Sequence, residues 1–139
     1  MGSTNPVNPL ILAILILTMI TDPLTHSIIG CAMAVHTALG NGFQELIYQR
    51  ALAIELGEKG ISFVREMEMP IFYKRKEIGT RRADFLVERK ILVEIKAMIK
   101  LDDVHLAQGL NYLVAYDLPI GLLINFGATK LEFKRLFRK

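Results

Sequence analysis

The sequence predicts an α/β domain of the α+β kind, in which a mixed β-sheet is flanked by helices. Three observations lead to this prediction. Two stretches before residue 60 have apolar residues at helical spacing, the stretch after residue 60 alternates with a period of two, and an apolar run follows a third helix. The 139 residues suit one domain. Because 52% of them are hydrophobic and 22% are charged, the composition excludes a disordered chain.

Two helices are predicted in the first half of the chain. Asp22 followed by Pro23 is typical of a helix start, since aspartate caps the first turn and proline suits the first helical position. This helix should end at the glycines of positions 40–42. A second helix is predicted from about Phe43 to Lys59, where Gly60 ends it.

The second half predicts strands around one more helix. Strands are expected over 61–69, where Pro70 breaks the first, then over 71–78 and 81–87 with a turn at 79–80, and over 91–97 after a turn at 88–90. Asp102 or Asp103 can cap a helix that reaches Tyr116. A buried strand over 120–126 and a final edge strand over 131–137 complete the order ααββββαββ.

The first twenty residues contain an apolar run, 10–20, interrupted by Thr18. It is shorter than the roughly 20 residues that a helix needs to cross a membrane, and it lacks the basic start and the cleavage site of a secretory signal. It can be a strand or helix packed on the body, a weakly membrane-associated segment, or an extension upstream of the true start. We favour the extension, because the sequence after Met19 suits the beginning of a helix. Residues 1–20 are therefore set apart from a single domain of residues 21–139.

The cysteine content narrows the class of protein further. Cys31 stands alone, so there can be no disulfide framework and no cysteine-based zinc site. Its small apolar neighbours indicate a packed, inert thiol. A reducing, cytoplasmic location fits this count best.

The formal net charge of +3 is unevenly distributed. Residues 1–64 hold two basic and four acidic residues, whereas residues 65–139 hold fifteen basic and ten acidic ones. Basic residues gather at 74–76 and 81–82, and the second half has the charge expected of a surface that meets a polyanion. The alternative is a solvated basic face, and charge alone favours that alternative.

The segment 82–96 places several charged residues on one predicted hairpin. If its turn is centred on Arg89, Asp84 lies opposite Glu94, and Lys96 points to the same side as Glu94. One face would then carry Ala83, Phe85, Val87, Ile91, Val93 and Ile95, and the other Arg82, Asp84, Leu86, Leu92, Glu94 and Lys96.

Two opposed carboxylates on neighbouring strands are destabilising unless something compensates their charge. A hard divalent cation such as Mg²⁺ would do so, and Lys96 could then position the attacking water or stabilise charge on a phosphate. The competing interpretation is a solvated hairpin whose carboxylates are offset by Arg82 and Lys96.

Several motifs also match a known family. Asp84 with the Glu94-Ile95-Lys96 tripeptide resembles the core signature of the PD-(D/E)XK nuclease superfamily. The segment 42–48 (GFQELIY) is similar to the GxxExxY motif that names a small family within it, and 108–112 (QGLNY) is similar to the QxxxY motif of its RecB-like branch. The Ile-Asn-Phe-Gly stretch at 124–127 is also typical, and the familiar proline before the aspartate is replaced by Ala83.

This resemblance implies a restriction-endonuclease-like core and roles for individual residues. Asp84 and Glu94 would be metal ligands, Glu45 would reach the metal directly or through water, and Lys96 would be the catalytic lysine. The remaining candidates would contact the substrate or the shell around the metal, namely Gln108, Tyr112, Tyr48, Arg82 and His105. Each has a structural alternative: Tyr48 can be ordinary packing, for example, and Gln108 a solvent-facing residue.

The function expected from the resemblance is a nuclease that uses Mg²⁺, or Mn²⁺, to hydrolyse phosphodiester bonds in DNA or RNA. The first rival is a nucleic-acid-binding or protein-binding module that keeps the fold without turnover. The second is a membrane-tethered interaction protein, which rests on residues 10–20 alone. The sequence leaves open the substrate, the mode of cleavage and the oligomeric state, including a homo-oligomer.

Overall fold

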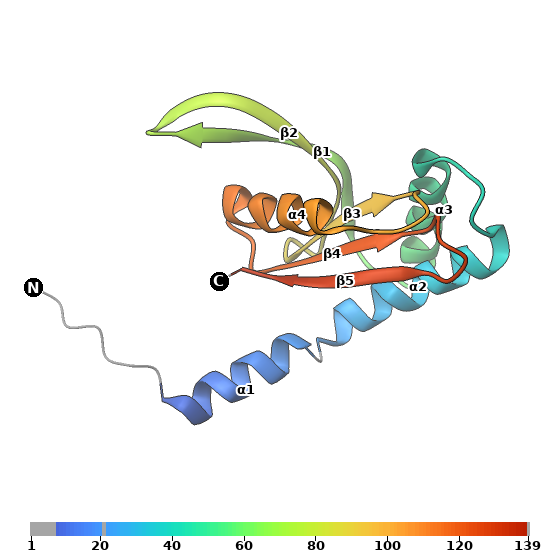
Figure 1. The fold of residues 1–139 in the computed structure, drawn as a ribbon. Helices are drawn as coiled ribbons and strands as arrows, with labels where there is room; N and C mark the ends of the chain where they lie inside the picture. Colours follow the sequence, from blue (N-terminus) through green and yellow to red (C-terminus); the bar gives the residue numbers. More distant parts are fainter. Residues whose placement is uncertain (1–7, 21, 139) are drawn as a thin grey trace, which may run out of the picture.

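A computed structural model of the protein describes residues 8–20 and 22–138. Five strands form one sheet in the order β1-β2-β3-β4-β5, where β3 and β4 are parallel and all other neighbours are antiparallel. Helices α2 and α3 lie on one face of the sheet and α4 lies on the other (Figure 1). This arrangement confirms the predicted mixed sheet with flanking helices. The elements are α1 (Pro9–Ile20), α2 (Pro23–Leu39), α3 (Glu45–Glu58), β1 (Phe63–Tyr73), β2 (Lys76–Val87), β3 (Ile91–Lys96), α4 (Asp103–Tyr116), β4 (Ile120–Asn125) and β5 (Glu132–Phe137).

The hydrophobic core has one part on each face of the sheet. The larger part packs α2 and α3 against the sheet, with Ile28, Leu52 and Phe85 fully buried. The smaller part lies under α4 and contains Leu92 and Leu113. Strands β3 and β4 are buried on both faces, because helices cover them on both sides.

The predicted helix starts and stops are largely confirmed. Asp22 caps α2 by accepting hydrogen bonds from the backbone N–H groups of Leu24 at 2.8 Å and Thr25 at 3.1 Å. Asp102 caps α4 in the same way, through Val104. The backbone of Gly60 has a φ of +70°, which favours glycine just past the end of α3.

The prediction that Pro70 ends a strand is wrong. β1 continues through Pro70, which pairs with Thr80, and the turn lies at Lys74 and Arg75 instead of Gly79-Thr80. Three strands therefore precede α4 instead of four. β1 is the first strand of the sheet, and proline is tolerated in edge strands because only one side of such a strand has to donate hydrogen bonds.

Part-way along the β1–β2 hairpin, the side chains exchange the face of the sheet to which they point. Pairing skips Glu66 and Asp84, and Glu66 has a φ of +52°. On one side of this interruption Phe85 packs under α2 and α3, whereas Ala83, two residues earlier, packs under α4. The prediction that Ala83 shares a face with Phe85 is therefore wrong, because the strand does not keep a regular pleat through Asp84.

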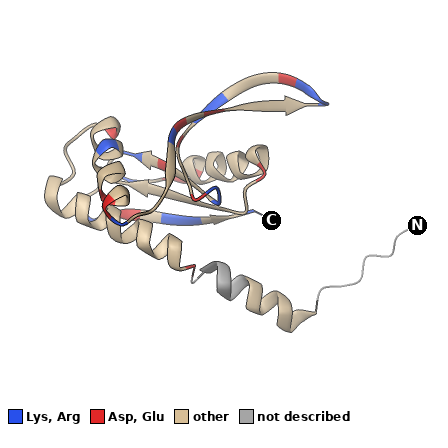
Figure 2. Ribbon diagram, turned by 180° about the vertical axis from the view of Figure 1, so that it is seen from behind, with Lys and Arg blue, Asp and Glu red and all other residues tan. Residues whose placement is uncertain are grey.

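Beyond this interruption the hairpin leaves the sheet and curves over α4 (Figure 1). We call residues 67–83 the arm. Its inward-facing Met67 and Met69 pack against the part of the core under α4. Lysine and arginine are concentrated toward its free end (Figure 2).

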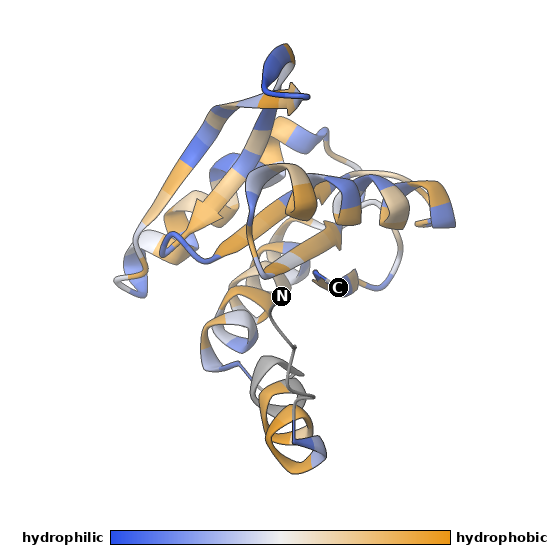
Figure 3. Cartoon of the chain, turned by 90° about the vertical axis from the view of Figure 1, so that its left-hand side faces the viewer, coloured by the Kyte–Doolittle hydropathy of each residue, from blue (hydrophilic) through white to orange (hydrophobic). Residues whose placement is uncertain are grey.

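Helix α1 projects away from the sheet and is almost uniformly hydrophobic (Figure 3). Its residues 10–15 are exposed, with Leu10 at 68%. Over these residues α1 is not packed on the body, which was one of the three alternatives left open for residues 10–20. No helix in the described part of the chain is both long and apolar enough to cross a membrane.

Candidate active site

Two carboxylates come from the adjacent strands β2 and β3. Phe85 pairs with Val93 and Val87 with Ile91, the register predicted for a turn centred on Arg89. The backbone pairing of β2 with β3 ends at Phe85 and Val93. The next residue away from the turn is Asp84 on β2 and Glu94 on β3. Asp84 uses Oδ2 to accept a hydrogen bond from the backbone N–H of Ile95 at 2.7 Å.

Glu94 is the most strongly perturbed carboxyl among the described residues. Its side chain lies in the core, with 5% of the residue exposed, and its Oε1 atom is buried without a hydrogen-bond partner in the described structure. Burial first, and then the charge and hydrogen bond of Asp84, raise the pKa of Glu94 to about 9, against the opposing charges of Arg81 and Lys96. A cation beside this oxygen would relieve the cost of an unpaired buried carboxylate.

Gln49 of α3 contacts the same site from the face of the sheet that α2 and α3 cover. This residue was not identified from the sequence. Its Nε2 donates a hydrogen bond to Oδ1 of Asp84 at 3.2 Å, and its Oε1 accepts one from Nη2 of Arg65 at 2.8 Å. Gln49 is buried, with 5% exposed. The available signal was its spacing of four from Glu45, which puts both residues on one face of the helix.

Two residues of the GxxExxY segment lie differently from their expected places. Glu45 is exposed in the first turn of α3. Within the described ranges no three His, Cys, Asp or Glu side chains are grouped so that they could hold a metal, so Glu45 does not join the two carboxylates here. Tyr48 is buried. Its hydroxyl donates to the carbonyl of Gly40 at 2.5 Å and accepts from the N–H of Phe43 at 3.1 Å, so it fixes the α2–α3 loop.

The α4 side of the site brings together four of the predicted residues. Lys96, His105, Gln108 and Tyr112 line a small cavity with Glu94. Its volume is about 10 Å³, close to the minimum that holds one water molecule. His105 lies in the first turn of α4, and its Nδ1 atom is 2.9 Å from Oδ1 of Asp102. His105 thus supports the start of the helix as well as lining the cavity.

The arginine beside the carboxylates is Arg81, and Arg82 points elsewhere. The guanidinium of Arg81 lies over the ring of Tyr112, 4.6 Å from its centre, and its charge acts on Glu94. Arg82 is exposed and pairs with Glu68 at 3.5 Å. The expectation that Arg82 accompanies Asp84 is wrong, for the same reason that misplaced Ala83: the hairpin turns over at Asp84.

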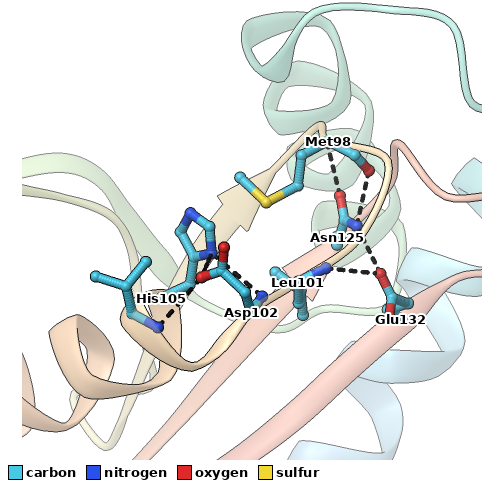
Figure 4. Close-up of polar contacts among 7 residues, drawn as sticks. Met98, Leu101, Asp102, His105, Asn125 and Glu132 are labelled. Atoms are coloured by element: carbon cyan, nitrogen blue, oxygen red, sulfur yellow. Dashed lines mark hydrogen bonds and ion pairs between the residues drawn. The ribbon is translucent and has the colours of Figure 1, made fainter.

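A compact hydrogen-bond network positions the loop between β3 and α4 (Figure 4). Buried Asn125 accepts from the N–H of Met98 at 2.9 Å through Oδ1, and its Nδ2 donates to the carbonyl of Met98 at 2.9 Å and to Oε1 of Glu132 at 2.8 Å. That same Glu132 oxygen accepts from the N–H of Leu101 at 3.1 Å. The network fixes the chain that leads from Lys96 into α4.

Gly127 allows the same loop to approach closely. A Cβ atom at this position would lie 2.3 Å from the backbone nitrogen of Met98 and 2.5 Å from its oxygen. The Ile-Asn-Phe-Gly stretch therefore has a structural purpose here: Asn125 bonds the loop, and Gly127 makes room for it.

The family follows from a comparison of the whole sequence. The sequence profile of the PD-(D/E)XK nuclease superfamily matches residues 22–136. The chain belongs to this superfamily. The match begins at the cap of α2 and extends into β5, so it includes Asp84, Glu94 and Lys96.

A solved structure has the same fold. The chain is similar to the crystal structure of SSO0001, with a TM-score of 0.53 and 21% identity, over 68% of this chain and 50% of that one. At this identity the likeness concerns the fold alone, and the aligned part spans half of the length of that structure. Among curated proteins no match was found.

Proposed function

We propose that the protein is a metal-dependent nuclease that hydrolyses phosphodiester bonds in DNA, with RNA as the alternative substrate. The observation that supports this most directly is the convergence of Asp84 and Glu94, with an unpaired, buried Glu94 oxygen, beside Lys96. Membership of the nuclease superfamily supports the reaction class.

The residues fit a hard divalent cation. Mg²⁺ and Mn²⁺ prefer oxygen ligands, and Mg²⁺ usually binds one or two carboxylates and completes its coordination with water and substrate phosphate. Asp84 and Glu94 supply two carboxylates, and the free Oε1 of Glu94 is the kind of oxygen that such an ion would bind. A bound Mg²⁺ lowers the pKa of water and polarises a phosphoryl oxygen.

The other residues have roles that follow from their positions. Lys96 carries a positive charge beside Glu94, where it can orient the attacking water and stabilise charge that develops on the phosphate. Gln108 and Tyr112 lie one turn apart on α4, on the face toward this cavity, and can contact the substrate backbone. Arg81 can pair with a phosphate oxygen at the same edge.

We further place the protein in the GxxExxY family, with features of the RecB-like branch, on the motifs at 42–48 and 108–112. In this proposal Glu45 approaches the carboxylates when metal and substrate are bound, directly or through water. Gln49, one turn later on the same helix, contacts Asp84, so Glu45 lies on the helix face that is turned toward the site.

The experiment measures cleavage of labelled single-stranded DNA, duplex DNA and RNA by the full chain, with Mg²⁺, Mn²⁺ or EDTA. We expect cleavage that requires a divalent ion and falls at least about 100-fold in Glu94→Gln. Glu58→Gln, an exposed change at the far end of α3, is the matched control and should retain activity.

A second readout separates binding of the ion from turnover. Mg²⁺ should raise the melting temperature of the wild type and leave that of Glu94→Gln unchanged. Absence of cleavage with either ion, or full activity in Glu94→Gln, would refute the nuclease. Retained nucleic-acid binding without cleavage would support the non-catalytic module instead.

A further inference from the structure

The free end of the arm is strongly basic. The arm holds five basic residues against two acidic ones, Glu68 and Glu77, and three of the five, residues 74–76, lie at its free end. Lys74 and Arg75 form the turn itself, Lys76 begins β2 directly after it, and all three are exposed. Figure 2 shows this concentration at the end of the hairpin that lies farthest from the sheet. The charge suits a polyanion such as the phosphate backbone of a nucleic acid.

The same segment exposes large apolar side chains that the core does not use. Phe72 and Tyr73 are each 61% exposed, and Ile78 is 65% exposed. The arm packs on α4 through Met67 and Met69, which lie nearer its base. Aromatic rings next to cationic side chains form the pattern by which proteins bind nucleic acid strands, with bases stacked on the rings and phosphates beside the cations.

The base of the arm coincides with the carboxylate site. Asp84 occupies the position at which the hairpin leaves the sheet, and Arg81 lies between Asp84 and the free end. Asp84 follows Lys76 by eight positions along β2, a span of about 26 Å at 3.3 Å per residue. A strand bound along the arm would therefore run toward Asp84 and Glu94.

We propose that the arm binds a single strand of nucleic acid, with the exposed ring of Phe72 stacking on a base and residues 74–76 contacting its phosphates, and guides that strand to the carboxylate site. This inference deepens the proposed nuclease function and rests on it, because guiding a strand to the carboxylates has a use only if the strand is cleaved there. A duplex hides its base faces and offers the arm only phosphates, whereas a single strand offers both. The arm should thus bind single strands more tightly than duplexes.

The test uses two arm variants of the full chain and one control. Lys74→Asn/Arg75→Gly/Lys76→Thr removes three charges, and Asn-Gly is the preferred pair for a turn with two residues of positive φ, so the hairpin is retained. Phe72→Thr/Tyr73→Thr removes both rings and keeps strand-forming residues. Arg89→Ala/Lys90→Ala/Lys130→Ala removes three exposed charges elsewhere on the surface.

Binding is measured by fluorescence anisotropy in EDTA, with a labelled oligothymidylate of about 20 nucleotides and a duplex of the same length. The charge variant should bind both probes at least tenfold more weakly. For the single strand, the slope of log K against log salt concentration should become less steep by about 2, at roughly 0.7 for each lost phosphate contact. The ring variant should lose about tenfold in affinity for the single strand and none for the duplex. The control should stay within about twofold of the wild type.

Three results would overturn the inference: equal weakening in the charge variant and the control, unchanged single-strand binding in the ring variant, or tighter binding of the duplex by the wild type. Because EDTA removes turnover, these outcomes are independent of the nuclease proposal. A chain that binds single strands through the arm but cleaves nothing would refute the nuclease and support the arm.

Discussion

Gln49 on α3 donates a hydrogen bond to Asp84 on β2, at 3.2 Å between Nε2 and Oδ1. The same amide accepts a hydrogen bond from Arg65 of β1, so one buried side chain connects three elements around the carboxylate. This contact fixes the rotation of the Asp84 side chain independently of any metal. The orientation of a metal-binding carboxylate by such a partner influences affinity for the ion.

Replacement of Gln49 should therefore weaken the binding of Mg²⁺ while the protein still folds. We expect Gln49→Leu to raise the Mg²⁺ concentration for half-maximal activity about tenfold, and to destabilise the protein by about 1–3 kcal/mol because Asp84 and Arg65 lose a partner. Gln44→Leu is the control, since Gln44 is exposed and caps α3 without a side-chain hydrogen bond. An unchanged Mg²⁺ requirement in Gln49→Leu would contradict this role.

The raised pKa of Glu94 predicts a pH dependence of stability in the absence of metal. The carboxyl titrates near 9 in the folded protein and near 4.5 as an isolated group, so the folded state binds an additional proton between these values. Its contribution to stability is complete below about pH 4.5 and is lost as the pH rises toward 9. Wild-type protein in EDTA should be less stable at pH 8.5 than at pH 6.

The measurement is urea unfolding in EDTA across this range, with Glu94→Gln for comparison. Glutamine is neutral at every pH, so the variant should lack this part of the slope and be more stable than the wild type at pH 8.5, by about 1–3 kcal/mol. Mg²⁺ should restore the wild type at that pH and leave the variant unaffected. Parallel pH profiles for the two proteins would disprove the assignment.

Arg81 and Arg82 are neighbours in sequence, and we expect different effects on stability. Arg81→Ala removes a cation–π contact with Tyr112 and should cost about 1–2 kcal/mol. Arg82→Ala removes only an exposed ion pair and should change the free energy of unfolding by less than about 0.5 kcal/mol. Chemical denaturation of both variants tests this, and equal effects would mean that the arm does not turn over at Asp84.

Two glycine substitutions should have opposite signs. Gly127→Ala would push Cβ against the backbone of Met98 and should destabilise the protein by roughly 1–3 kcal/mol or more. Gly57→Ala, in α3, meets open space and should stabilise by about 0.4–1 kcal/mol, because alanine favours the helix. Melting temperatures of the two variants provide the comparison. A tolerated Gly127→Ala would show that the β3–α4 loop can move away.

Removal of residues 1–20 tests whether the domain begins at α2. Residues 10–15 of α1 are exposed, and the two parts of the core contain no residue of α1 among those described. The shortened chain should therefore keep its melting temperature within about 2 °C, since surface changes rarely exceed about 0.5 kcal/mol. It should also aggregate less, because an exposed apolar patch is removed. A large loss of stability would place α1 in the folded domain.

Local signals predicted most of the fold. The cap at Asp22, the glycine at position 60 and the hairpin register around Arg89 each depend on a few neighbouring residues, and all were read correctly. The continuation of β1 through Pro70 depends on the strand being at the edge of the sheet, which no local pattern states. The turn at Lys74 and Arg75 lacks the Gly or Asn that usually marks positive φ, so it carried no signal.

The site was harder to predict where the backbone is irregular. The placement of Asp84 beside Glu94 followed from strand register, whereas the roles of Asp84, Glu94 and Lys96 were predicted from the family resemblance. Arg82 was favoured over Arg81 because the prediction assumed a regular alternation through Asp84, and a left-handed residue at position 66 removes that regularity. Gln49 was missed because an uncharged amide inside a helix is not distinctive in a sequence, and its spacing of four from Glu45 was the available signal for a partner 35 positions away.

The interruption at Glu66 and Asp84 also divides the hairpin into two parts. The part nearer the β2–β3 turn belongs to the sheet and carries the register that aligns the two carboxylates. The arm lies outside the sheet and packs on α4. Its length can therefore change by paired insertion or deletion near the turn without shifting Asp84 against Glu94. If the proposed nuclease function holds, the reach of the arm toward a bound strand and the alignment of the two carboxylates can be varied separately, by an arm of different length or charge above an unchanged Asp84–Glu94 pair.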